Sequence, residues 1–413
     1  MNWQFRVKTR LWLSGLLLLS AVVTSTSAAN VRSTGSLRSM ARIYMASGGY
    51  EKAQPLLESA LDLAKRADAS DSEMCACVLD LAFLYKNQGR LAEAEEMCRL
   101  GLELQKKVNG PNHPHVAHTL RIMSEIYQGQ VRYDQAADSL EQGLAIMRKV
   151  GGQDGVEIAP LRVDMARLLV TQGQFTRAES LFAEALVAIE SSYGPEHAYT
   201  AKVLASMAAL YERQGRHGSA EELTTRAYSV LEKVYGANHH FLVPTWLVMS
   251  GTHQARGELA EARALLDRSL AVTTSRADCG RLAECDVLIR LGEFHILCED
   301  YRRAELALRK AQDILDDSQC ADGDRTATVL NNLAIVRMNQ GKHDRAQALC
   351  LEALNILERI FDEHHPIVAD VLETLATSHR LSGDDTEAGR LEKRAERIRA
   401  QNRLNSTPDA VTI

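Results

Sequence analysis

The sequence predicts an all-α protein of stacked helical hairpins, because one pattern returns at intervals that are multiples of 42 residues. The first recurring feature is a glycine, found at Gly89, Gly173, Gly215, Gly257, Gly341 and Gly383. The second is an alanine five positions later, found at Ala94, Ala136, Ala178, Ala220, Ala262, Ala304, Ala346 and Ala388. Val131 and Glu299 occupy the two remaining glycine positions. Each unit is expected to be two helices joined by a turn at the glycine position.

The apolar residues around the turn have helical spacing. Val78, Leu81, Ala82 and Tyr85 fall at i, i+3, i+4 and i+7, which is one face of a helix with 3.6 residues per turn. A single short hairpin buries too little to be stable, so the hairpins must stack on their neighbours. A chain of 413 residues therefore needs no division into two or three globular domains.

Composition agrees with this class and excludes others. Hydrophobic residues make up 46% of the chain and aromatic residues only 5%, which suits Ala- and Leu-rich helices better than a β-sandwich or a barrel. The net charge of −6 is spread along the chain, so we expect no nucleic-acid partner.

Residues 1–29 read as a secretory signal peptide. Basic residues (Arg6, Lys8 and Arg10) precede an uncharged apolar stretch over 11–23, and small residues at 26–29 suit signal-peptidase cleavage. The stretch of about 13 residues is shorter than the roughly 20 that span a bilayer. We expect an exported protein, periplasmic or extracellular, in contact with a membrane only if the signal is retained as an anchor.

The rest of the chain divides into the repeat array, over 30–400, and a flexible tail, over 401–413. Nine hairpins are expected, with first helices starting near residues 34, 75, 117, 159, 201, 243, 285, 327 and 369. Small residues also recur seven positions before each turn, at Ala82, Ser124, Ala166, Ala208, Ser250, Gly292, Ala334 and Ala376. Small side chains at fixed positions allow adjacent helices to approach closely.

These small-residue positions resemble the tetratricopeptide repeat, and the 42-residue period is similar to that of kinesin light chains. A loop of Gly-Pro-x-His-Pro type between units carries the second resemblance, at Gly110–Pro114, Gly194–His197, Gly236–His239 and His365–Pro366. The resemblance covers residues 34–400. It implies a right-handed superhelix whose first helices line a concave groove, acting as a scaffold for protein–protein interaction.

The histidines allow two interpretations. His113, His115 and His118 are close enough in sequence to suggest a zinc site. However, His113 recurs in the repeat loop as His197, His239 and His365, and such a residue is expected to hydrogen-bond at the start of the following helix. We therefore predict no metal and no cofactor. The sequence also has no Gly-rich phosphate loop and no nucleophile elbow, so an enzyme is not expected.

Eight cysteines in an exported chain raise the question of disulfides. Cys98 and Cys350 share one repeat position and are expected to be small core residues. Cys285 begins a first helix and Cys320 follows the next helix, so antiparallel packing would bring these two together. A Cys285–Cys320 disulfide is our hypothesis.

By analogy with the family, groove-facing side chains lie two before, one after and four after the first small position. Polar candidates for peptide binding at or near these positions are Arg167, Arg290, Asn331, Asn332, Arg337 and Arg380. They favour an acidic or extended peptide in the second half of the array, although ordinary surface residues explain them equally well. The alternative function is a structural component of an envelope-associated assembly, which binds through the convex face or the ends.

Overall fold

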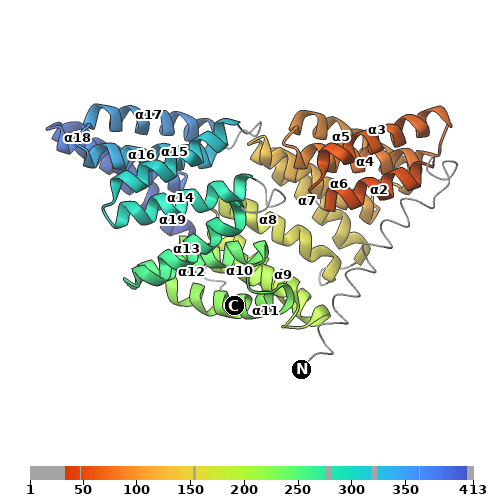
Figure 1. The fold of residues 1–413 in the computed structure, drawn as a ribbon, viewed down its shortest axis with the longest axis horizontal. Coiled ribbons are helices and arrows are strands. Elements are labelled where there is room, and N and C mark those ends of the chain that lie inside the picture. The colour runs from red at the N-terminus through yellow and green to blue at the C-terminus, as the bar shows by residue number, and fades with distance from the viewer. Residues whose placement is uncertain are drawn as a thin grey trace, which may run out of the picture.

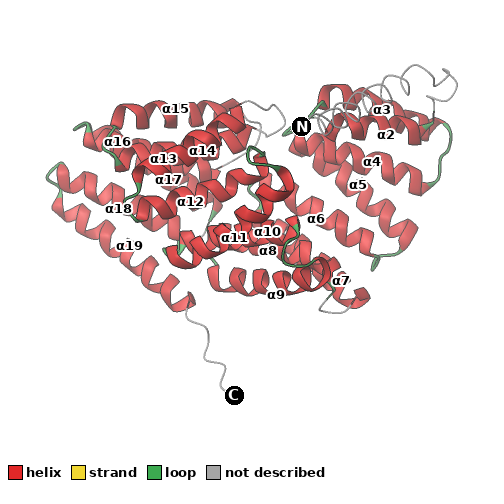
Figure 2. Cartoon of the chain, turned by 60° about the horizontal axis from the view of Figure 1, so that its bottom comes forward, coloured by secondary structure: helices red, strands yellow, loops and turns green. Residues whose placement is uncertain are grey.

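The computed structural model describes residues 33–46, 48–151, 155–274, 281–317, 323–361 and 363–406. Helices account for all the regular structure in these ranges (Figures 1 and 2). The helices are α2 (Thr34–Ala46), α3 (Tyr50–Arg66), α4 (Asp71–Asn87), α5 (Leu91–Asn109), α6 (Pro114–Gly129), α7 (Tyr133–Gly151), η1 (Val156–Ile158), α8 (Ala159–Thr171), α9 (Phe175–Tyr193), α10 (Ala198–Arg213), α11 (His217–Tyr235), η2 (His240–Leu242), α12 (Val243–Ala255), α13 (Leu259–Thr274), α14 (Arg281–Leu297), α15 (Tyr301–Asp317), α16 (Gly323–Asn339), α17 (His343–Ile360), α18 (Pro366–Leu381) and α19 (Asp385–Ser406).

The α-helices pair in chain order into nine antiparallel hairpins within the described ranges, and each hairpin packs on the next. In Figure 1 the N-terminal hairpins lie at the upper right and α15–α18 at the upper left, with α9–α12 below and between them. The chain therefore follows a curved path. The predicted all-α superhelical solenoid is confirmed.

The ends of several helices differ from our expectation. Most first helices begin three or four residues earlier than predicted, as at Asp71, Pro114 and Ala198. At the other end, α19 continues to Ser406 instead of ending near residue 400. The Asn402 side-chain amide donates a 2.9 Å hydrogen bond to the carbonyl of His364, which ties this last turn to the loop before α18. The proposed signal peptide and residues 407–413 lie outside the described residues.

The turn position has one backbone conformation in every repeat that the structure describes. The turn glycines have φ between 71° and 90°, and Val131 and Glu299 adopt the same left-handed region, at 61° and 57°. In each turn the following residue donates its N–H to the carbonyl five residues earlier, as Arg132 does to Tyr127 at 2.9 Å. The hairpin geometry therefore requires this conformation even where the residue is not glycine.

The small-residue positions are all at the centre of the helix packing. The eight alanines that follow the turns are fully buried, as are Ala82, Ala208 and their equivalents. At Gly101 an added Cβ would lie only 2.4 Å from Cδ2 of Leu79. A side chain of one helix thus occupies the space that a small residue of its antiparallel partner helix leaves open, and this seam between the paired helices reaches the density of a protein core.

The repeat-loop histidines form hydrogen bonds at the starts of the following helices, as predicted. Nδ1 of His113, His197, His239 and His365 accepts the backbone N–H two residues later, at 3.1 to 3.3 Å. Each imidazole therefore satisfies one of the amides that a helix start leaves without a partner.

The array also closes on itself, which no repeat pattern indicates. Hairpins three to five and hairpins eight and nine share one hydrophobic cluster. Within it the rings of Tyr133 and Phe361 stack at 5.3 Å, and Phe361 stacks on His365 at 3.9 Å. An added Cβ at Gly173 would lie 2.6 Å from Cδ of Pro366, so backbone and ring are in close contact there. We call this junction the clasp: Tyr133 of α7 and Gly173 of the α8–α9 turn meet Phe361, His365 and Pro366 around the start of α18.

Candidate functional site

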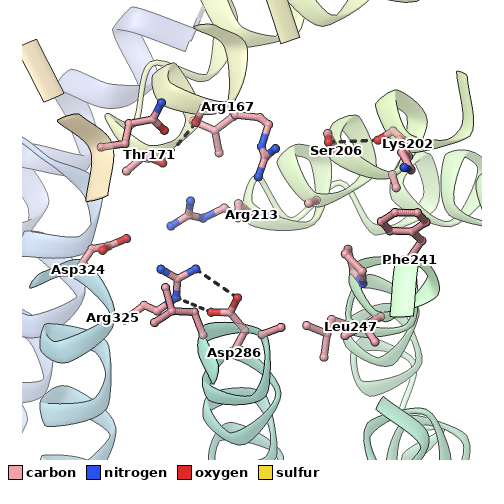
Figure 3. Close-up of a pocket in the computed structure, with 18 of the residues that line it drawn as sticks. Arg167, Thr171, Lys202, Ser206, Arg213, Phe241, Leu247, Asp286, Asp324 and Arg325 are labelled. Atoms are coloured by element: carbon pink, nitrogen blue, oxygen red, sulfur yellow. Dashed lines mark hydrogen bonds and ion pairs between the residues drawn. The ribbon is translucent and has the colours of Figure 1, made fainter. Parts of the chain in front are cut away.

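The closed path of the chain encloses a hollow of about 840 Å³ (Figure 3). Its walls come mainly from the first helices α6, α8, α10, α12, α14 and α16. Apolar and aromatic side chains form part of the surface, among them the half-buried Phe241 and Leu247. The volume falls within the range of about 300–1,000 Å³ that is usual for ligand pockets.

Several acidic side chains of the first helices are paired with arginines of other repeats. The ion pairs are Asp80 with Arg38 (2.7 Å), Asp164 with Arg121 (2.9 Å), Asp286 with Arg325 (2.6 Å) and Glu212 with Arg290. They join first helices to one another along the array. These residues therefore stabilise the stacking of hairpins and are not available to a ligand without loss of an internal contact.

Three cations that line the hollow differ from the arginines of these ion pairs. Within the described residues, the side chains of Arg167, Lys202 and Arg213 form no ion pair with a carboxylate. Figure 3 shows Arg167 and Arg213 pointing into the same part of the hollow, with Lys202 farther away beside Phe241. The Lys202 amine lies 3.5 Å from the centre of the Phe241 ring, a cation–π contact.

The surroundings of Lys202 and Arg213 disfavour their charge. Burial lowers the pKa of Lys202, and no carboxylate compensates. The pKa of Arg213 is also lowered, because the surrounding walls remove water, although the negative charge of Asp324 partly opposes this effect. Arg213 is exposed within the hollow and remains protonated. An anion bound beside Lys202 would relieve the cost of burying its charge.

The charged lining of the hollow is net positive. Arg167, Lys202, Arg213 and Arg325 outnumber Asp286 and Asp324, which leaves two positive charges on a chain whose net charge is −6. The hollow therefore differs in sign from the protein as a whole.

Of the residues predicted for peptide binding, Arg167 lines the hollow. The others lie elsewhere. Arg290 is bound by Glu212 and Glu293, Arg337 by Glu305, and Arg380 by Glu392. Asn332 is buried, and its amide lies 3.4 Å from Glu293. Asn331 has a buried side-chain oxygen without a hydrogen-bond partner in the described structure. The cations without an ion pair that line the hollow therefore lie in the middle of the array, whereas we expected the binding residues mainly in its second half.

Lys202 was missed because the predicted groove positions began too late in each first helix, and Arg213 because it lies one residue beyond the last of these positions. Lys202, Pro244 and Asp286 are spaced by 42 residues, and all three line the hollow. They lie one helical turn before the earliest position that we assigned to the groove. Extending the register by this turn would have found Lys202 from the sequence.

Other kinds of site receive no support from the described part of the chain. There, no three His, Cys, Asp or Glu side chains gather as a metal ion would require. No helix in the same ranges is long and apolar enough to cross a membrane. Cys285 is buried with its Sγ 3.7 Å from the carbonyl of Ala311, whereas Cys320 lies outside the described residues, so the disulfide hypothesis stays untested.

The chain matches protein-family models in sequence and several solved structures in fold. Tetratricopeptide repeat models match residues 74–149, 157–233 and 325–401, and also 36–68 and 245–268. No curated protein matches the sequence.

Solved structures share the fold at low sequence identity. A Rap protein crystallised in complex with Competence and Sporulation Factor is 11% identical, with a TM-score of 0.64 over 90% of this chain and 99% of that one. BtubC (BKLC) from P. vanneervenii is 21% identical, with a TM-score of 0.46 over 55% and 90%. A Podosopora anserina putative kinesin light chain with nearly identical repeats is 22% identical, with a TM-score of 0.42 over 51% and 100%. With one repeat model matching more than half of its residues, the chain belongs to the tetratricopeptide repeat family.

Proposed function

We propose that this protein is an exported scaffold that binds an extended segment of a partner protein inside the hollow. Tetratricopeptide repeat folds are typically non-catalytic scaffolds for protein–protein interaction. The hollow itself supports this function: it has a volume of about 840 Å³, and aromatic side chains line it together with three cations that form no ion pair with a carboxylate among the described residues.

At about 840 Å³ the hollow has room for a peptide segment and not for a folded domain. Its walls determine how such a segment is recognised. They are helices whose backbone groups are hydrogen-bonded within the helix, so recognition must come from side chains. Apolar groups such as Phe241 and Leu247 would supply affinity, and the charged groups would fix orientation. Because the helices are stacked and clasped before binding, little ordering of the protein opposes association.

A pair of tryptophan substitutions tests the site. Ala209 lines the hollow, so Ala209→Trp should fill part of it and exclude a peptide. Val187, on α9, is 69% exposed and does not line the hollow, so Val187→Trp is the matched control. Peptides selected from a random display library on the full-length chain should bind the control and not Ala209→Trp. Equal binding to both folded variants would contradict the site and favour the convex face or the ends, as an assembly component would require.

Export is proposed from the basic and apolar features of residues 1–29. It is tested by the mass of the N-terminal peptide of the chain recovered from the producing cells. A chain that begins at about residue 29 or 30 in the exported fraction would support cleavage. An intact N-terminus on a membrane-bound chain would instead support an anchor.

A further inference from the structure

We infer that the ligand of this hollow is an acidic peptide segment with two carboxylate side chains about five residues apart. One carboxylate would be held between Arg167 and Arg213, and the other by Lys202. This inference rests on the proposed function, because it names the chemistry of the peptide that the hollow would bind.

The separation of the cations sets the spacing of the ligand charges. Lys202 and Arg213 both lie on α10, eleven residues apart. At 1.5 Å per residue they are about 16 Å apart along the helix, too far for one carboxylate to contact both. An extended peptide advances about 3.3 Å per residue, so about five residues cover this distance. A single free anion would satisfy one end of the hollow and leave the other unpaired.

Arg167 and Arg213 form the end that suits a shared carboxylate. They come from adjacent first helices, α8 and α10, and point into one part of the hollow (Figure 3). Two guanidinium groups that face the same space repel each other unless an anion lies between them. Arginine also presents paired N–H donors that match the two oxygens of a carboxylate. The same ligand group would therefore compensate both charges.

The acidic side chains near Arg213 do not take the place of the ligand carboxylate. Glu212 and Asp370 act on the charge of Arg213, but they are already paired with Arg290 and Arg399. Asp324 faces Arg213 across the hollow without an ion pair to it in the described structure. An incoming carboxylate would be repelled from the Asp324 wall and directed toward Arg167.

Lys202 forms the second end, with an apolar surface beside it. Phe241 lies under the amine, and Leu247 lines the same part of the hollow. A carboxylate at Lys202 would gain a charge-assisted hydrogen bond while the adjacent ligand residue packed on these apolar groups. We therefore expect hydrophobic residues between the two acidic positions.

Selection from a random peptide library on the full-length chain tests both ideas separately. Binders that Ala209→Trp excludes should carry Asp or Glu at two positions four to six apart, with apolar residues between them. Cavity-dependent binders without this enrichment would overturn the acidic inference and leave the proposed function standing. Failure to find any cavity-dependent binder would overturn both.

Neutralising substitutions then assign each end. With a selected fluorescent peptide, Arg213→Gln and Lys202→Gln should each weaken binding about tenfold to a hundredfold, the usual loss for a hydrogen bond to a charged group. A Glu→Gln change at one end of the peptide should remove the effect of one variant and preserve that of the other. Arg302→Gln, an exposed cation on α15 that does not line the hollow, should bind normally. Unchanged affinity in all three variants would contradict the assignment.

Discussion

His365 and Thr171 are 194 residues apart in sequence, yet Nε2 of His365 donates a 2.7 Å hydrogen bond to the carbonyl oxygen of Thr171. The same ring accepts the N–H of Ile367 through Nδ1, at 3.3 Å. A carbonyl can only accept and an amide N–H can only donate, so one neutral tautomer satisfies both contacts. One histidine therefore caps its own helix and holds the clasp to a distant hairpin.

His365→Ala should open the clasp. The variant loses the helix cap, worth about 1 kcal/mol, and also the contact with Thr171 and the stacking on Phe361. His113→Ala is the matched control, because His113 caps α6 in the same way and lies outside the clasp. Small-angle scattering should show a larger radius of gyration for His365→Ala only. Equal values for both variants would mean that the clasp does not hold the array closed.

Glu299→Gly should stabilise the protein by about 0.5–1 kcal/mol. Glu299 adopts a φ of 57°, a conformation that costs an L-residue about 1–2 kcal/mol and that glycine adopts without this cost. Glycine loses more conformational entropy on folding, which offsets part of the stabilisation. Its side chain is exposed, so little packing is lost. Thermal unfolding measures the change. Gly215→Ala, at a turn with open space around it, should lower the stability by a similar amount. A Glu299→Gly variant less stable than wild type would refute this account.

Glu305 should make the protein sensitive to strong acid. Hydrogen bonds from Arg337, Arg309 and Gln340 lower the pKa of Glu305 to about 2. A carboxyl with a depressed pKa stabilises the folded state fully above its unfolded pKa of about 4.3, and this stabilisation is lost as pH falls toward 2. In Arg337→Gln the unfolding midpoint should depend less on pH over this interval. Lys310→Gln, which removes an exposed charge from the same helix, should keep the wild-type slope.

Ala208→Leu should destabilise the array by about 1–3 kcal/mol through overpacking. Ala208 is fully buried against Ala220 and Val248, which leaves no room for three more carbons. Ala209 is the next residue and lines the hollow, so Ala209→Leu should be tolerated. Chemical denaturation compares the two. Equal midpoints would show that the seam at Ala208 is not closely packed.

The repeat architecture could be predicted from the amino-acid sequence, because the same local rules act in every unit. The apolar spacing of Val78, Leu81 and Ala82 specifies a helix, and the turn and small residues specify how neighbouring helices pack. Loop histidines such as His113 could likewise be assigned to helix starts. Each of these features depends on residues within about one repeat, so a periodic sequence is sufficient to reveal it.

Which charged side chains form ion pairs, and where the array closes, became known from the folded chain. The sequence suggested that Arg290 and Arg337 could bind a peptide, but they form ion pairs with Glu212 and Glu305, which are 78 and 32 residues away. The clasp joins His365 to Thr171 because small rotations between successive hairpins accumulate until distant units meet. The total rotation depends on every hairpin between the two contacts. No single repeat contains the information, so the hollow with Arg167, Lys202 and Arg213 exists only in the folded array.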